Sequence, residues 1–277
     1  MTALLERLNR PLDAKLVIIA AEGLGSSNAA NSGVYQALRE GIATTASLQV
    51  PCPWARGAAS GYQGEDVGVS LTVNAQHDHY RWGPITHAPS LLDGDGGFPR
   101  TATDLWEHAD LEETRRECRA QIERAIVWGF PITHLSAHVD ALCARPEFFD
   151  IYLDLAVEFR VPISLPDPAI DLGFPARELA LEEGILVPDR VIAANGEREA
   201  RPALQAVLDD LRPGVSELRL APAIDTPELR SLTPNWAARV GDAHLITHDE
   251  AFRVALERTG AELIGFRELR DAQRLSA

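Results

Sequence analysis

Three side chains suited to acid–base or metal chemistry lie close together near the middle of the chain. The segment 131–140 (PITHLSAHVD) contains His134, His138 and Asp140. Imidazole and carboxylate groups are common ligands of divalent metal ions and common proton-transfer groups in hydrolases. The two histidines are four residues apart in an extended segment, so their spacing alone does not place both rings on one face. A structural, hydrogen-bonded role for either ring therefore stays open beside a role in a site.

Other acidic and histidine side chains follow strands that we expect nearer the N-terminus. Residues 15–21 (KLVIIAA) are an apolar run without polar alternation, which is typical of a strand buried on both faces of a parallel sheet. Glu22 follows this run directly, and the sequence HDH at 77–79 follows a further expected strand at 67–73. Because ligands and catalytic groups collect at the carboxyl ends of strands in α/β folds, we expect these side chains to lie near His138.

Strands and helices alternate along the whole chain. The patterns predict strands at the start of segment 131–140 and at residues 15–21, 45–50, 67–73, 162–165, 186–193, 215–220 and 262–266. The short spacings leave no room for two separate domains, so we expect one α/β domain over residues 1–277. A closed or nearly closed, TIM-like (β/α) barrel is the expected architecture, and a doubly wound open sheet is the alternative.

Residues 74–100 form a long segment without the period of a helix or a strand. The segment is rich in Gly, Pro, His and Asp, and it contains His77, Tyr80 and Trp82. A loop of this length inside a compact domain is usually functional or disordered. Because its aromatic side chains and prolines favour order, we expect a lid over the site.

The composition excludes several classes of partner. The formal net charge is −15, which argues against nucleic acid because a phosphate backbone needs a basic surface. No apolar run approaches the roughly 18 to 20 residues that span a bilayer, and the first residues lack the pattern of a signal peptide. Cys52, Cys118 and Cys143 are odd in number and scattered, which favours reduced thiols. We expect a soluble cytoplasmic protein without nucleic acid or membrane partners, and a homo-oligomer stays open.

Several segments, taken in order, resemble the YdjC-like carbohydrate deacetylase family. VGVSLTVN resembles the family's Gly-Val-His-Leu-Thr-Leu strand, THLSAHVD its Thr-His-Leu-Asp-Ser-His segment, and SELRLAPAID its Glu-Leu-x-x-His-Pro-Gly turn. KLVIIAAEGLGSS stands where the family has a strand followed by Ala-Asp-Asp-Phe/Leu-Gly. The segments NSGVYQALREGIATTASLQVPCPWA and ELIGFREL also match. The resemblance covers about 15–272, which we expect to be the core of the domain.

The resemblance implies a distorted (β/α) barrel that removes acetyl groups from N-acetylated sugars with one divalent metal ion, zinc or magnesium. In the family an aspartate and two histidines hold the metal, a second aspartate acts as the base, and the histidine of the His-Pro-Gly turn assists. A metal held in this way activates a water for attack on the amide carbonyl, and the base takes the proton of that water.

At the positions of the family's metal ligands this sequence keeps one of three. Gly23 stands in place of the metal-binding aspartate and Ser70 in place of the first histidine, whereas His138 retains the second histidine. Glu22 stands at the position of the base and keeps a carboxylate. Because metal affinity comes from several preorganised ligands, a single histidine does not hold an ion at useful occupancy. We therefore expect an eroded metal site and no bound cofactor.

Other positions of the family's site are replaced as well. Ser136 stands for an aspartate, Ser164 for an arginine, and Ala221 for the histidine of the His-Pro-Gly turn. These replacements add to the loss of the metal ligands, and they predict that the inherited reaction does not run in this protein.

The first hypothesis is a pseudoenzyme that binds a sugar-like ligand or a partner in the mouth of the barrel. Its ligand-binding residues would be His138, Asp140 and His77. Tyr80 and Trp82 would offer aromatic surfaces to a sugar ring, and packing inside the lid is the alternative role for both rings.

Two other hypotheses stay open. An active hydrolase could use a rebuilt site, in which Glu22, His138, Asp140 and the lid histidines form a relocated metal site or a metal-free acid–base pair. A non-catalytic regulatory partner of an active relative is also compatible with the acidic composition and the family fold. The sequence contains neither a nucleotide-binding phosphate loop nor a Gly-x-Ser-x-Gly nucleophile elbow.

Overall fold

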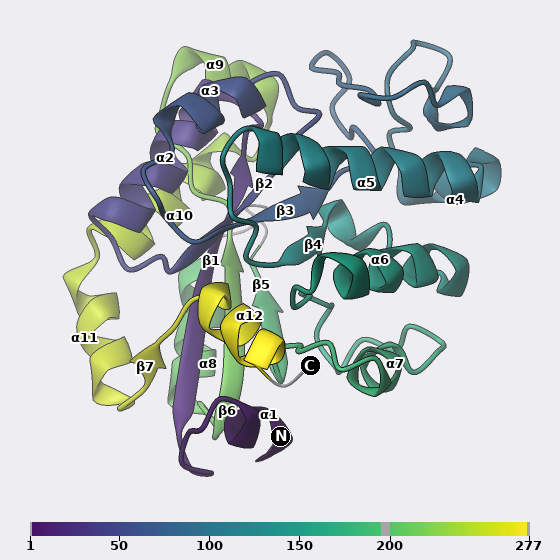
Figure 1. Ribbon diagram of the computed structural model, residues 1–277. Helices are drawn as coiled ribbons and strands as arrows, with labels where there is room; N and C mark the ends of the chain where they lie inside the picture. The colour runs from purple at the N-terminus through teal and green to yellow at the C-terminus, as the bar shows by residue number, and fades with distance from the viewer. Residues whose placement is uncertain (1, 195–199, 276–277) are drawn as a thin grey trace.

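A long central strand, β1 (Lys15–Leu24), organises the fold (Figure 1). Residues 16–21 are buried because this run is apolar on both faces of the sheet. The structure is a computed structural model that describes residues 2–194 and 200–275. In these ranges the parallel sheet has the order β4-β3-β2-β1-β6-β5, with β7 also on β1. The other strands are β2 (Thr45–Leu48), β3 (Val67–Leu71), β4 (Leu135–Ala137), β5 (Arg190–Ala193), β6 (Gly214–Leu220) and β7 (Glu262–Leu263).

Helices connect the strands and cover the sheet. Contacts join α2 (Asn28–Arg39) to α10 (Trp236–Thr247), and α5 (Leu111–Val127) to α6 (Pro146–Phe159), and Figure 1 shows the two pairs on opposite sides of β1. The other helices are α1 (Thr2–Arg7), α3 (Ala55–Gly61), α4 (Ala102–His108), α7 (Ala176–Glu182), α8 (Ala200–Asp209), α9 (Pro227–Leu232), α11 (Glu250–Arg258), α12 (Phe266–Leu275), and the 3₁₀ helices η1 (Pro89–Leu91) and η2 (His138–Asp140). In the described part of the chain, no helix has both the length and the apolar composition of a membrane span.

The sheet curls into a half-barrel, and this confirms the prediction of an α/β fold of the distorted (β/α)-barrel type. The strand expected at 162–165 is reduced to one bridge, in which Ile163 pairs with Leu135 of β4. Prolines before and after this bridge lack N–H donors, so a longer ladder does not form. The segment still links β4 to the stretch that leads into β5, because the Ile163 N–H donates to the carbonyl of Leu186 at 3.1 Å.

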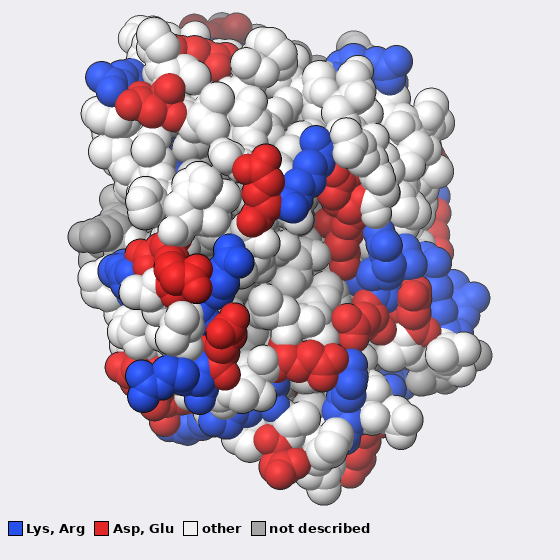
Figure 2. All heavy atoms as spheres, turned by 90° about the vertical axis from the view of Figure 1, so that its left-hand side faces the viewer, with Lys and Arg blue, Asp and Glu red and all other residues white. Residues whose placement is uncertain are grey.

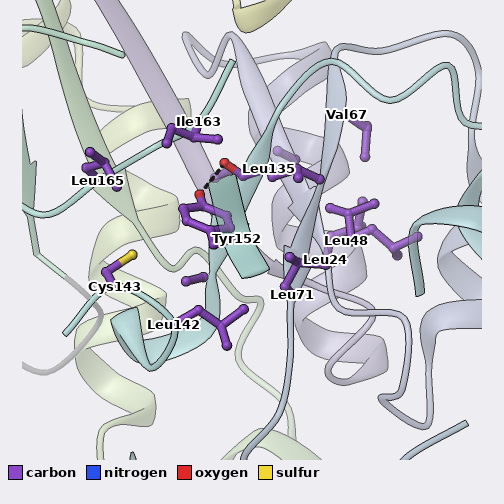
Figure 3. Packing of buried hydrophobic residues seen from close by; sticks show 14 of the residues in the cluster. Leu24, Leu48, Val67, Leu71, Leu135, Leu142, Cys143, Tyr152, Ile163 and Leu165 are labelled. Carbon is purple, nitrogen blue, oxygen red and sulfur yellow. Dashed lines mark hydrogen bonds between the residues drawn. The ribbon is translucent and has the colours of Figure 1, made fainter. Parts of the chain in front are cut away.

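Tyr152 of α6 reinforces this gap from the buried core. Its hydroxyl donates to the carbonyl oxygen of Leu135 at 2.8 Å (Figure 3) and is shared with the carbonyl oxygen of Ser164 at 2.9 Å. The ring is fully buried among apolar side chains of the strands and of the loop after β4. Packing and hydrogen bonding together hold the strand ends that carry the site.

Candidate functional site

A cavity of about 630 Å³ opens at the carboxyl ends of the strands. Residues at the ends of β1, β3, β4 and β6 line it, together with residues of the 74–100 segment. This is the edge at which α/β proteins bind ligands, and the volume is within the usual range of small-molecule sites. The structure brings eight positions that the sequence singled out to this cavity, namely Glu22, Gly23, Ser70, His77, Trp82, His138, Asp140 and Ala221.

A bulge in β1 lies where Glu22 meets the cavity. The pairing of β1 with β2 shifts register between Ala21 and Leu24. Gly23, inside the bulge, has a φ of 88°, a conformation that favours glycine. Bulges next to functional sites commonly re-aim a side chain. Gly23, which the resemblance aligns with a metal-binding aspartate, is therefore also the residue that permits this backbone shape.

The pKa of the Glu22 carboxyl group is raised to about 7. Burial is the largest cause, because it disfavours the charged form. The guanidinium of Arg219 opposes this shift, with its Nε 3.9 Å from Glu22 Oε1, and the carboxylates of Asp140 and Glu217 add to it. A carboxyl group with a pKa near 7 can take up or release a proton at neutral pH.

Arg219 of β6 is the buried centre of this charged group, and the sequence reasoning missed it. Its Nη1 donates to Asp140 Oδ1 at 3.1 Å and its Nε to Glu217 Oε1 at 3.2 Å. Its Nη2 donates to Ser164 Oγ at 2.6 Å. The resemblance implies an arginine at the position of Ser164, so the guanidinium of Arg219 in β6 reaches that place from a different strand. Burial lowers the pKa of Arg219, but the surrounding carboxylates outweigh this effect and raise it. The sequence did offer one signal for Arg219. Glu217 and Arg219 are opposite charges two residues apart in a mostly apolar strand, so both side chains lie on the same face of the sheet.

Both ring nitrogens of His138 are hydrogen-bonded to glutamine side chains. Gln49 Nε2 donates to Nδ1 at 2.9 Å, and the ring Nε2–H donates to Gln76 Oε1 at 2.9 Å. The Cys52 thiol donates to Gln49 Oε1 at 3.5 Å, which orients that amide. These contacts select the tautomer with the proton on Nε2. Burial lowers the pKa of His138 to about 4, so the ring is neutral at pH 7.

With this bonding both ring nitrogens of His138 are engaged by protein groups, and a metal ion would have to displace one of the two glutamine amides. Among residues 2–194 and 200–275, no group of three or more His, Cys, Asp or Glu side chains is placed to hold a metal. Gly23 offers no side-chain ligand, and Ser70 offers a hydroxyl where the resemblance implies a histidine. The donor set at this place does not fit a divalent ion.

Gln49 and Gln76 also escaped the sequence reasoning. Their amides are neither carboxylates nor imidazoles, the types that a search for metal and acid–base chemistry selects. Their positions could have pointed to the site, because Gln49 directly follows β2 and Gln76 lies near the start of the 74–100 segment, where side chains at strand ends and in the expected lid meet.

The aromatic lid residues occupy different places around His138. His77 and Trp82 line the cavity, whereas Tyr80 lies outside the residues that line it. The Trp82 ring is T-shaped to the rings of His138, at 6.4 Å between centroids, and His77, at 5.9 Å. Trp82 is only 5% exposed, so it offers a narrow surface to a ligand. The Tyr80 hydroxyl donates to the carbonyl of Ser26 at 2.8 Å and ties the lid to the loop after β1.

His134 is a structural residue outside the cavity. It is 1% exposed, and its ring stacks on Phe266 with 4.0 Å between ring centroids. One ring nitrogen lies 2.9 Å from the hydroxyl of Ser47. Burial lowers the pKa of His134 to about 3, so the ring stays neutral. Of the two histidines in segment 131–140, only His138 reaches the cavity.

A family model and several curated relatives match this chain. The model of the YdjC-like protein family matches residues 16–258. A carbohydrate deacetylase from Thermus thermophilus is 36% identical over 260 residues, which cover 92% of this chain and 94% of that protein. A carbohydrate deacetylase from Geobacillus stearothermophilus is 28% identical over 265 residues, which cover 91% and 96%.

A solved structure agrees with the fold. The crystal structure of a proposed cellobiose-phosphate cleavage protein from Enterococcus faecalis V583 matches with a TM-score of 0.81 at 23% identity, covering 92% of this chain and 99% of that chain. The half-barrel is therefore shared over nearly the full length. The family match over most of the sequence and the Thermus relative together confirm the family prediction, and the chain belongs to the YdjC-like protein family.

Proposed function

We propose that this protein binds a carbohydrate-type ligand in the cavity and does so without a divalent metal ion. The bonding of His138 carries the proposal: Gln49 and Gln76 engage both ring nitrogens of the one histidine that the family pattern retains. The glycine and serine at the other two ligand positions support it. The ligand class is supported by the relatives, which are named carbohydrate deacetylases.

The lining of the cavity suits a ligand with many hydroxyl groups. The amide side chains of Gln49, Gln76 and Asn235 each donate and accept hydrogen bonds, as sugar hydroxyls do. The hydroxyl groups of Ser70 and Thr101 have the same double capacity. Small-molecule sites fix orientation with a few such polar groups. Metal binding is not needed for this mode of recognition.

Calorimetric titration of the chelator-treated protein with N-acetylglucosamine oligomers tests the proposal. We expect saturable binding that is unchanged by zinc, no stoichiometric zinc uptake, and no release of acetate. Gln76→Ala should weaken binding, whereas Gln63→Ala, at an exposed position outside the cavity lining, should not. Zinc bound at one ion per chain and lost in His138→Ala would overturn the metal-independent site.

A metal-free hydrolase is a second candidate, and the pKa of Glu22 near 7 favours it. In that reaction the Glu22 carboxylate would take a proton from water as the water oxygen attacks the acetyl carbon. The C–N bond would then break, the proton would pass to the amine, and acetate would leave. His138 and Asp140 line the cavity together with Glu22 and would contact the substrate there.

Acetate release separates the two candidates. A hydrolase of this kind would release acetate in the presence of chelator, at a rate that rises as the pH passes through about 7. Glu22→Gln would abolish the release and leave oligomer binding in place. Binding without acetate release in the wild-type protein favours the non-catalytic candidate.

A further inference from the structure

The place that the family gives to a metal-binding carboxylate is filled in this protein by a guanidinium. A Cβ atom on Gly23 would lie 2.9 Å from Nη2 of Arg239, a residue of α10. Arg239 also lines the cavity beside Ala221, the position of the family's turn histidine. Two side chains of the family pattern are thus reduced to glycine and alanine, and one arginine lies against both positions.

The backbone around this guanidinium is well fixed. Arg239 Nε donates to the carbonyl of Ala221 at 3.1 Å, and the N–H of Ala221 donates to Asp242 Oδ2 at 3.0 Å. The N–H of Ala223 donates to the Arg239 carbonyl at 3.1 Å. These contacts use the Nε of Arg239, whereas its Nη2 lies beside Gly23 and the residue lines the cavity.

The other cations in the cavity lining are already paired. Arg219 bonds to Asp140 and Glu217, and Arg100 pairs with three aspartates of the lid at 2.8 to 3.2 Å. Arg239, by contrast, has no carboxylate within 4 Å among the described residues, although Glu22 and Asp242 lie near enough to act on it electrostatically. Its guanidinium is therefore the cation in the described lining that can take an anionic group from a ligand.

We infer that the cavity takes an acidic sugar, whose carboxylate binds the two Nη groups of Arg239. A guanidinium matches a carboxylate with two parallel N–H···O bonds. A single unpaired guanidinium balances one negative charge, whereas a phosphate of nearly two charges would face Glu22 and Asp242 without a second free cation. This inference rests on the proposed carbohydrate-binding function and names the chemical class of its ligand.

A matched pair of ligands tests the carboxylate directly. Calorimetry compares glucuronate-containing disaccharide with its methyl ester, in which the charge is removed and the sugar rings are kept. We expect the acid to bind the wild-type protein at least about tenfold more tightly than the ester, and the difference to shrink at high salt. Inorganic phosphate serves as the competing probe, and we expect it to bind more weakly than acetate.

Variants place the effect at Arg239. Arg239→Gln should remove the preference for the acid over the ester, and Arg239→Lys should restore part of the preference because it restores the charge. Arg212→Gln, at a residue that is 62% exposed on the surface, is the control for a change in net charge. Circular dichroism confirms that each variant is folded, and Arg239→Lys keeps the test available if Arg239→Gln does not fold.

The outcomes separate this inference from the function on which it rests. Equal binding of acid and ester, or an acid preference that survives Arg239→Gln, overturns the role of Arg239. If neutral N-acetylglucosamine oligomers bind while the acid does not, the carbohydrate function stands and the acidic ligand class is wrong. If neither sugar class binds, both proposals fail. Tighter binding of phosphate than of acetate would replace the carboxylate with a phosphorylated ligand and contradict the inference as stated.

Discussion

At the scale of single residues, neighbours decide what the same side-chain type does. His134 and His138 are four positions apart, yet one ring is stacked in the core on Phe266 and the other is clamped between Gln49 and Gln76 at the cavity. Burial lowers the pKa of both rings, but only one of them can meet a ligand. A histidine in a sequence therefore carries little functional weight until its hydrogen-bond partners are known.

The lowered pKa of His134 predicts a loss of stability in acid. The folded pKa of about 3 lies below the ordinary 6.5, so unfolding takes up a proton between these values. Its contribution to stability is complete above pH 6.5 and falls by up to about 1.4 kcal/mol for each pH unit below it. Urea unfolding from pH 7 to pH 4 should show a shallower decline in His134→Gln than in the wild-type protein. Identical pH slopes in the two proteins would contradict the assignment.

Gly23 should resist even a small side chain. Its positive φ disfavours residues with a Cβ atom, and the added methyl group would meet Arg239 Nη2. We expect Gly23→Ala to lower the free energy of unfolding by about 1–2 kcal/mol in urea titrations. Gly241→Ala is the matched control, because a Cβ there meets nothing within 4 Å inside helix α10. That control should gain about 0.5–1 kcal/mol, and equal effects at both positions would refute the argument.

At the scale of elements, the 74–100 segment is held by carboxylates of α5 that point into it. Glu117 is fully buried and accepts from the N–H groups of Ile85, at 3.1 Å, and Thr86, at 2.9 Å. It also accepts from the hydroxyl of Thr86 at 2.6 Å. The lid therefore depends on a few charge-assisted hydrogen bonds at a helix that lies outside the cavity.

Replacing this carboxylate should loosen the lid. In Glu117→Gln an amide donor would face N–H groups that need an acceptor, so we expect a loss of about 1–3 kcal/mol. Amide hydrogen exchange should become faster at Ile85 and Thr86. Glu123→Gln, at an exposed position of the same helix, should leave their exchange unchanged. Unaltered protection of the lid in Glu117→Gln would show that its other contacts suffice.

At the scale of the whole molecule, surface charges of both signs are spread over the protein, whereas closure of the sheet depends on a few buried contacts. The net charge is −15, yet acidic and basic side chains are interspersed on the face that carries α2, α10 and α11 (Figure 2). The ion pair of Arg39 with Glu65 and that of Arg201 with Asp249 are examples of this mixing. Around the sheet, closure depends on the short segment at Ile163 and on the hydroxyl of Tyr152 behind it.

Removing that hydroxyl should destabilise the entire domain. In Tyr152→Phe the carbonyls of Leu135 and Ser164 lose a buried donor, and we expect a cost of about 1–2 kcal/mol in thermal or urea unfolding. Tyr62→Phe is the comparison, because its hydroxyl bonds to the Glu65 carbonyl at 3.2 Å in a less buried place. A smaller loss is expected there. A larger loss in Tyr62→Phe would argue against the role given to Tyr152.

Sequence patterns were enough to predict the fold class, the family and the side chains at the strand ends. Apolar runs such as 15–21 form buried strands wherever they occur, and the alternation with helices makes the sheet parallel. Because parallel strands end at one edge, Glu22 and His138 had to meet at the same cavity. Motif matching alone also predicts that Gly23 and Ser70 stand where the resemblance implies metal ligands.

The hydrogen bonds and charges of the site, in contrast, became visible only in the three-dimensional structure. Gln49 and His138 are 89 positions apart, and Asp140 and Arg219 are 79 apart, so no local pattern links them. The neutral tautomer of His138, the pKa of Glu22 near 7 and the place of Arg239 against Gly23 all follow from such contacts. The physical reason is that hydrogen bonding and burial depend on distance in space, whereas periodicity in the chain reports only on local backbone and on which face is apolar.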